Sequence, residues 1–194
     1  MTAPRSPNAH RNAGGGTLIA IEGLGDQALV KAARAELDDL PRAVRGGCSV
    51  WDASGIFGDM VVAGDEAGHA SARTLLLLYA ADLAFRLRWE IRPALNKNRY
   101  VVATPYVATA MAFGRAAGVD GEWLKNLFQF APRPSRTRTL PASRGAGDRS
   151  GFVEFVCERL STRPEGPKRR ELRDRIWAEL NHKGADGRGR KSAT

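Results

Sequence analysis

The sequence predicts a three-layer α/β protein, with a parallel sheet of about five strands between two layers of helices. One observation is the short apolar run TLIAIEG at 17–23, which is typical of a buried parallel strand that ends at glycine. Another is the next segment, 26–40, whose apolar residues fall at helical spacing. The same strand–turn–helix order then recurs along the chain, and this alternation predicts βαβ units.

The remaining elements follow from periodicity and from helix breakers. Pro41 ends the first helix. A glycine- and aspartate-rich loop is expected between the second strand and the longest helix. The predicted strands are 48–55, 99–106 and the unusually polar 135–140, and the predicted helices are 71–98, 106–118, 121–131, 151–160 and 168–182.

The 194 residues suit one folded domain, which we place at 17–182. The flanking segments 1–16 and 183–194 are rich in small and polar residues and are predicted to be disordered tails, the second of them basic. The start of the chain has no apolar signal region, and no apolar run approaches the roughly 20 residues that span a bilayer. We therefore expect a cytoplasmic protein without membrane contact. Cys48 and Cys157 are expected to be buried thiols.

The charge balance is strongly basic, with 30 Lys and Arg against 21 Asp and Glu, a net charge of +9 and a pI near 10.2. Most of the excess lies from Arg133 onward. One interpretation is a solvated basic face with basic tails. The other is nucleic-acid contact through phosphates, although these stretches contain few of the aromatic residues that stack on bases.

Three turns are candidate ligand sites, because ligands of open parallel sheets bind at the carboxyl ends of the strands. These turns are 23–28, 52–58 and 104–109. The three histidines, His10, His69 and His182, are far apart in the sequence and form no recognisable catalytic or metal-binding set.

Five segments resemble the thymidylate (dTMP) kinase family in order and spacing over about 17–160. They are IAIEGL, LLLLYAADLAFRLRWEIRPAL, VVATPYVATAMAF, EWLKNLFQFAPRPSRT and DRSGFVEFVCERL. The resemblance implies a P-loop nucleoside monophosphate kinase fold and a dimer formed through the long helix. In an active member it also implies ATP and magnesium as cofactors.

The expected phosphate loop, G-x-x-x-x-G-K-[ST], departs from this pattern. If it begins at Gly23, Ala28 takes the place of the second glycine, Leu29 that of the lysine and Val30 that of the hydroxyl residue. Lys31 then comes two positions late, roughly 200° around the helix.

A second register begins at Gly25 and restores Lys31. Val30 then replaces the second glycine, and Ala32 replaces the hydroxyl residue that binds magnesium. Asp26 suits the beginning of a helix, where it acts as a capping residue, but repels a triphosphate. The degenerate phosphate loop is therefore assigned to Gly23, Gly25, Asp26 and Lys31, and no catalytic residue or metal ligand is assigned.

The other family motifs are altered as well. Thr104-Pro105-Tyr106 replaces the family's D-R-Y triplet, Leu83 replaces the arginine that the family directs at the nucleotide, and the lid segment is short. The pocket is either open or filled by side chains such as Leu29 and Phe57. If it is open, it is predicted to be lined by Asp52, Ser54, Asp82, Tyr106, Thr109, Arg144 and Arg149.

Three functions stay open at this point. The leading hypothesis is a thymidylate-kinase-like pseudokinase that has lost ATP binding and phosphoryl transfer, acts by binding or regulation, and needs no cofactor. The second is an active, ATP- and magnesium-dependent kinase of dTMP or a related nucleotide, in which Lys31, Arg144 and Arg149 supply the positive charge. The third is a nucleic-acid-binding module that uses the basic C-terminal half.

The expected partners are a second copy of the chain, a protein partner, and weakly bound nucleotide or nucleic acid. The dimer is expected through the helix 71–98, because Leu75, Leu76, Leu77, Leu78 and Tyr79 are consecutive and therefore point all round it. The alternative is that both faces of this helix are buried within one chain.

Overall fold

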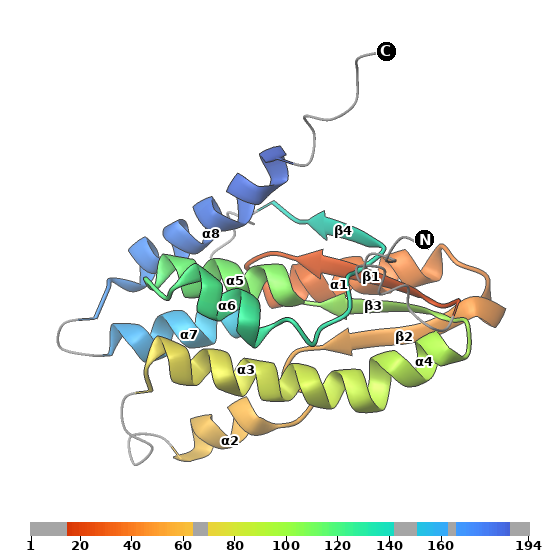
Figure 1. Cartoon of the computed structure of the whole chain (residues 1–194), viewed down its shortest axis with the longest axis horizontal. Helices are drawn as coiled ribbons and strands as arrows, with labels where there is room; N and C mark the ends of the chain where they lie inside the picture. The colour runs from red at the N-terminus through yellow and green to blue at the C-terminus, as the bar shows by residue number, and fades with distance from the viewer. Residues whose placement is uncertain (1–14, 64–69, 142–150, 163–165, 187–194) are drawn as a thin grey trace, which may run out of the picture.

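The computed structural model describes residues 15–63, 70–141, 151–162 and 166–186. Helices lie on both sides of one sheet (Figure 1). In chain order the elements are β1 (Thr17–Glu22), α1 (Asp26–Asp38), a 3₁₀ turn (Arg42–Val44), β2 (Arg45–Val50), α2 (Ile56–Ala63), α3 (Ala72–Arg86), a π-helical turn (Leu87–Ile91), α4 (Arg92–Asn96), β3 (Tyr100–Thr104), α5 (Val107–Ala116), α6 (Gly121–Leu127), β4 (Arg136–Thr139), α7 (Phe152–Ser161) and α8 (Arg169–Asp186).

The sheet is parallel throughout and has the order β2-β3-β1-β4. At its centre, Ile19 of β1 lies opposite Val102 of β3 on one side and Arg136 of β4 on the other. The described chain therefore forms four strands, so the prediction of about five was wrong. After β4, the described residues form only the helices α7 and α8, which leaves β4 at the edge of the sheet.

The alternation of side chains along β1 separates two cores. Ile19 and Ile21 face α1 and pack with its buried Leu29, Ala33 and Leu37. Leu18 and Ala20 face the other way, into the larger core built by α3, α5, α7 and α8. The predicted three-layer arrangement is confirmed, and it places the start of α1 and the start of α5 at the same edge of the sheet (Figure 1).

The predicted long helix, 71–98, is divided into α3, the π turn and α4. Its first turn is capped by Ser71, whose hydroxyl accepts a hydrogen bond from Thr74 N at 3.1 Å. The hydrogen bonds of a π turn span one residue more than those of an α-helix, so the turn shifts which side chains face the sheet. Arg86, Leu87 and Ile91 are all buried around this shift.

Two local predictions need correction. The loop expected after the second strand contains α2, whose beginning is capped by the Asp52 carboxylate, which accepts hydrogen bonds from Phe57 N at 2.8 Å and Gly58 N at 3.0 Å. Helix formation here buries the Phe57 ring, which local composition does not reveal. Asp26 is the first residue of α1 rather than its cap, because Gly25 takes the capping position with extended backbone angles.

Further details concern the thiols and the helix lengths. Both cysteines are free; Cys157 is buried as predicted, whereas Cys48 is only half-buried on the edge strand β2. Helix α8 continues to Asp186, past the expected end at 182. Over the described ranges, no helix combines the length and the apolar character needed to cross a lipid bilayer.

Candidate functional site

The turn between β1 and α1 is the candidate phosphate loop, and it contains only Gly23, Leu24 and Gly25. The first backbone bond of the helix, Leu29 N to Gly25 O at 3.0 Å, forms directly after it. A phosphate loop needs an extended backbone that curls around the phosphates before the helix begins. Here the motif positions taken by Ala28 and Leu29 already lie inside α1.

Apolar packing holds this turn on the sheet side. A Cβ added at Gly23 would lie 3.2 Å from Leu29 Cδ2 and 3.6 Å from Leu140 Cβ. Leu29, the residue at the lysine position of the first register, is 2% exposed and belongs to the core between α1 and the sheet. Leu29 is therefore buried against the turn.

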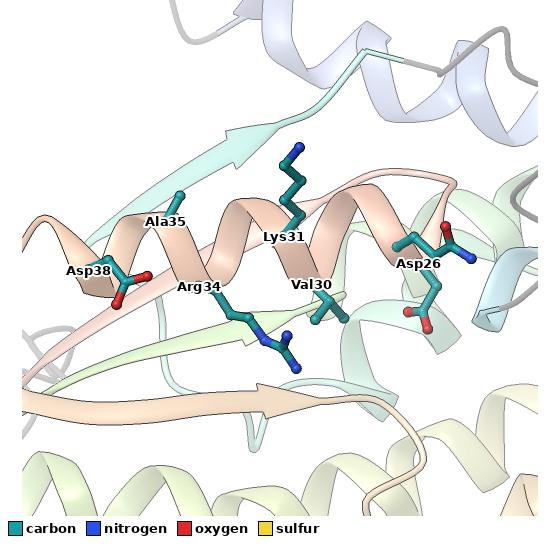
Figure 2. Close-up of a pocket in the computed structure, with 7 residues that line it drawn as sticks. Asp26, Val30, Lys31, Arg34, Ala35 and Asp38 are labelled. Carbon is teal, nitrogen blue, oxygen red and sulfur yellow. The ribbon is translucent and has the colours of Figure 1, made fainter.

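Lys31, the lysine of the second register, lies elsewhere. It is exposed and lines a groove of about 560 Å³ along the outer face of α1 together with Asp26, Gln27, Val30, Arg34, Ala35 and Asp38. Figure 2 shows Lys31 and Arg34 extending from opposite sides of the middle of the helix. The groove thus follows one helix, from its first residue, Asp26, to Asp38.

The beginning of α7 packs directly on the beginning of α1. A Cβ at Gly151 would lie 2.6 Å from Asp26 Cβ and 3.2 Å from Asp26 Cγ. Gly151 also has a φ of +107°, which favours glycine. Backbone from a distant part of the chain therefore lies against the first residue of the candidate phosphate-binding helix.

The buried carboxylate of Glu22 organises the start of α5. Its oxygens accept hydrogen bonds from Tyr106 N at 3.0 Å, Ala108 N at 3.0 Å and Thr109 N at 3.1 Å, and from the Thr109 hydroxyl at 2.7 Å. The same hydroxyl accepts a hydrogen bond from Gly23 N at 3.2 Å. Burial raises the pKa of Glu22 above its ordinary value of 4.5, while these hydrogen bonds oppose the rise.

Glu22 therefore occupies the place where an anion binds most favourably. The unpaired N–H groups and the dipole of a helix attract negative charge to its N-terminus. At α5 that charge comes from the chain itself. Within the motif IAIEGL the glutamate was not singled out by sequence reasoning, because its partners lie 84 to 87 residues away.

The turn 104–106 is held by buried donors from α3. The peptide bond between Thr104 and Pro105 is cis. The Tyr79 hydroxyl lies 2.9 Å from Pro105 O and 2.8 Å from Tyr106 O, and Arg86 Nη1 donates to Pro105 O at 3.1 Å. The Tyr106 hydroxyl points away and donates to Pro132 O at 2.9 Å. Its hydroxyl thus has a partner within the fold.

Arg86 is a buried charged residue that sequence reasoning missed. Its side chain is 0% exposed, with Nε 2.9 Å from Ser49 Oγ, Nη2 2.7 Å from Ser49 O and Nη1 3.9 Å from Asp82 Oδ2. It links the end of β2 to the 104–106 turn. The available signal was the i, i+4 spacing of Asp82 and Arg86 within an otherwise apolar helix.

Asp52, Ser54 and Asp82, three predicted pocket residues, are brought together. Asp82 Oδ2 accepts from Asp52 N at 3.1 Å, and Asp82 Oδ1 accepts from Ser54 N at 3.0 Å and Ser54 Oγ at 2.9 Å. Asp82 is fully buried, and Asp52 caps α2. These contacts shape the turn after β2.

The other predicted pocket residues divide into two groups. Tyr106 and Thr109 lie at the start of α5, Thr109 beside Glu22 and the Tyr106 hydroxyl directed at Pro132 O. Arg144 and Arg149 fall outside the described residues.

Aromatic rings fill the space between these turns. Phe152, the first residue of α7, is 1% exposed. Its ring centroid lies 4.4 Å from that of Tyr79, 5.7 Å from Phe113, and 6.1 Å from both Trp51 and Phe57. One side chain thus joins the turn after β2 to α3 and α5, and Phe57 is itself buried, as expected for a filled pocket.

A metal centre has no support in the described part of the chain. The residues at 15–63, 70–141, 151–162 and 166–186 contain no group of three or more His, Cys, Asp or Glu side chains arranged to hold a metal ion.

Comparison with known proteins finds thymidylate kinases among the similar proteins. No protein-family model matches the chain. A thymidylate kinase from Syntrophotalea carbinolica is 32% identical over 140 residues, which cover 66% of this chain and 63% of that protein. A solved thymidylate kinase from Ehrlichia chaffeensis superposes with a TM-score of 0.58 at 14% identity, covering 87% of this chain and 89% of that one.

This chain has a thymidylate-kinase-like P-loop kinase fold. A probable thymidylate kinase from Pyrococcus abyssi adds a match of 41% identity over 58 residues, which are 28% of that protein's length. The matched part of the chain thus spans less than two thirds of these curated relatives. The predicted family resemblance is confirmed at the level of the fold.

Proposed function

We propose that this thymidylate-kinase-like chain has lost ATP binding and phosphoryl transfer and acts as a binding or regulatory pseudokinase. The observation that carries the proposal is the three-residue turn from β1 to α1. Phosphoryl transfer depends on positioned phosphates, a lysine and a magnesium ligand. With α1 beginning at Asp26, the backbone that would surround the phosphates is part of a helix.

Electrostatics favours the same conclusion. Both helix N-termini that face the carboxyl ends of the central strands carry a carboxylate of the chain itself, Glu22 at α5 and Asp26 at α1. A nucleotide phosphate brought to either helix would meet like charge, which opposes its binding. Lys31 lies on the outer face of α1 and is exposed to solvent.

The acceptor side supports the proposal through packing. The Phe152 ring lies between the turn after β2 and helix α5, where it packs against the rings of Trp51 and Phe113. The polar groups of Asp52, Ser54 and Asp82 hydrogen-bond within the fold. A nucleoside would have to displace a buried aromatic ring in order to bind there.

The test is a pair of measurements on the full chain. Isothermal titration with ATP, dTMP and dTDP, each with magnesium, is expected to give no saturable binding up to about 1 mM, a dissociation constant that corresponds to about −4.1 kcal/mol. A coupled assay with ATP and dTMP is expected to give no dTDP. Formation of dTDP above the level of a blank without enzyme would contradict the proposal and favour the active-kinase alternative.

We also propose that the chain forms a homodimer through α3 and the π turn. Their outer face exposes three large apolar side chains, with Leu77 53%, Phe85 39% and Trp89 64% exposed. Large apolar groups gathered on one face of a helix favour a contact between copies. Light scattering is expected to give twice the mass of one 21.0 kDa chain, and Phe85→Glu with Trp89→Glu is expected to give a monomer. A monomeric wild-type protein would contradict this.

A further inference from the structure

The outer edge of β4 is the most exposed piece of regular structure in the sheet. All four of its residues, Arg136–Thr139, are exposed. On its inner side β4 pairs in parallel with β1, and the contact is extended by Ser135 N to Leu18 O and Leu140 N to Glu22 O, both at 2.8 Å. Among the described residues, no strand pairs with its other side.

The backbone of this edge is arranged to receive another strand. Along a strand, successive residues direct their N–H and C=O groups to opposite sides. Leu140 N, just after the strand, bonds to Glu22 O of β1, so Arg138 and Arg136 point to β1 as well, and Thr137 and Thr139 direct their backbone groups outward. Unpaired groups in this position are a template for strand addition.

The charge of the edge indicates what kind of strand fits. Arg136 and Arg138 are 59% and 54% exposed and share one carboxylate, that of Glu36 on α1. Arg133, just before the strand, is exposed as well. The strand therefore carries two positive charges against the single negative charge of Glu36 beside it. On the other face of the strand, Thr137 and Thr139 present small β-branched side chains.

We propose that the edge of β4 binds an extended acidic segment of a partner protein by strand addition. The outward backbone groups of Thr137 and Thr139 form the ladder, and carboxylates at alternate positions of the segment pair with the guanidinium groups of Arg136 and Arg138. This inference rests on the proposed binding role of the chain, and it adds the class of partner to that role.

The experiment titrates the full chain with synthetic peptides in the absence of nucleotide. The probe is a capped seven-residue peptide of alternating glutamate and valine, and its charge control alternates lysine and valine. A third peptide keeps the glutamates but carries N-methyl groups on alternate amides, which removes one edge of the ladder. Binding is followed by calorimetry and by backbone amide NMR shifts of Thr137–Leu140.

The acidic peptide is expected to bind at least tenfold more tightly than the lysine peptide and than the N-methylated peptide. Arg138→Glu is expected to weaken it at least tenfold. Arg170→Glu, the same charge change at an exposed position of α8, serves as the matched control and is expected to leave the affinity within twofold. Circular dichroism melting of both variants checks that they are folded.

Three results would overturn the inference. They are the absence of NMR shifts in β4 at millimolar acidic peptide, equal binding of the N-methylated peptide, and an equal effect of Arg170→Glu. Tighter binding of a single-stranded oligonucleotide at the same amides, with a steep loss in salt, would also overturn it in favour of phosphate contact. Because no nucleotide substrate is present, none of these results bears on whether the chain phosphorylates dTMP.

Discussion

Helices α1 and α5 begin at the same edge of the sheet, yet their first turns are completed in different ways. At α5 a buried carboxylate, that of Glu22, accepts three backbone N–H bonds and one hydroxyl bond. At α1 the first turn begins at Gly25, and the start of the helix lies against backbone at Gly151. The start of α5 is therefore organised by charge, and the start of α1 by close packing.

This difference shows two ways in which the chain itself completes a helix start at the carboxyl edge of a parallel sheet. An N-terminus at the ligand edge of a parallel sheet needs negative charge or a neighbour to satisfy it. Glu22 supplies the negative charge at α5, and α7 supplies the neighbour at α1. Substitutions at each helix start test this contrast, and the largest effect is expected at Glu22.

Removing the Glu22 carboxylate should produce the largest loss. Glu22→Ala leaves three buried backbone donors without their acceptor, and we expect unfolding in urea to become easier by about 4 kcal/mol. Glu179→Ala is the control, since its bond to Arg115 lies near the surface and should contribute less than about 1 kcal/mol. Equal losses in the two variants would show that Glu22 does not organise α5.

The packing at α1 should be sensitive to one added methyl group. Gly151→Ala places a Cβ 2.6 Å from Asp26 Cβ at a positive φ, and we expect a loss of about 3 kcal/mol in thermal or urea unfolding. Gly121→Ala is the matched control, because nothing lies within 4 Å of its added Cβ. If Gly151→Ala were as stable as Gly121→Ala, the close contact between α7 and α1 would be refuted.

The charge of Glu22 should make stability depend on pH. Burial raises the folded-state pKa of Glu22 above 4.5, so the folded protein holds this proton more tightly than the unfolded chain does. The resulting stabilisation is complete below the unfolded-state pKa and is lost as pH rises through the folded-state pKa. The stability of the wild type relative to Glu22→Gln should therefore increase as pH falls from 7 toward 5. Denaturant midpoints at several pH values measure this, and a difference that is flat or falls on acidification would contradict it.

Lys31 should matter least. It is exposed on the outer face of α1, so Lys31→Ala is expected to change stability by less than about 0.5 kcal/mol. It should also leave any residual nucleotide binding unchanged in calorimetry. Loss of ATP binding or of turnover in this variant alone would favour the active-kinase alternative and would remove the contrast between the two helix starts.

Local patterns predicted much of the fold. The apolar run at 17–23 and the helical spacing after it placed β1 and α1 within two residues of their observed bounds. They failed where burial comes from afar: α2 forms in a loop-like segment because Phe57 packs on Phe155 and Phe152. They also overlooked Arg86, whose hydrogen-bond partners Ser49 and Pro105 lie 37 and 19 residues away.

The sequence alone determined that the segment after β1 lacks the second glycine and the hydroxyl residue of a phosphate loop in either register, because these are residue types at known positions. Only the tertiary structure decided that α1 begins at Asp26, that Gly151 lies against it, and that Glu22 serves α5. Each of these joins residues far apart along the chain. Their meeting depends on the packing of the whole sheet and its helices, which local spacing does not encode.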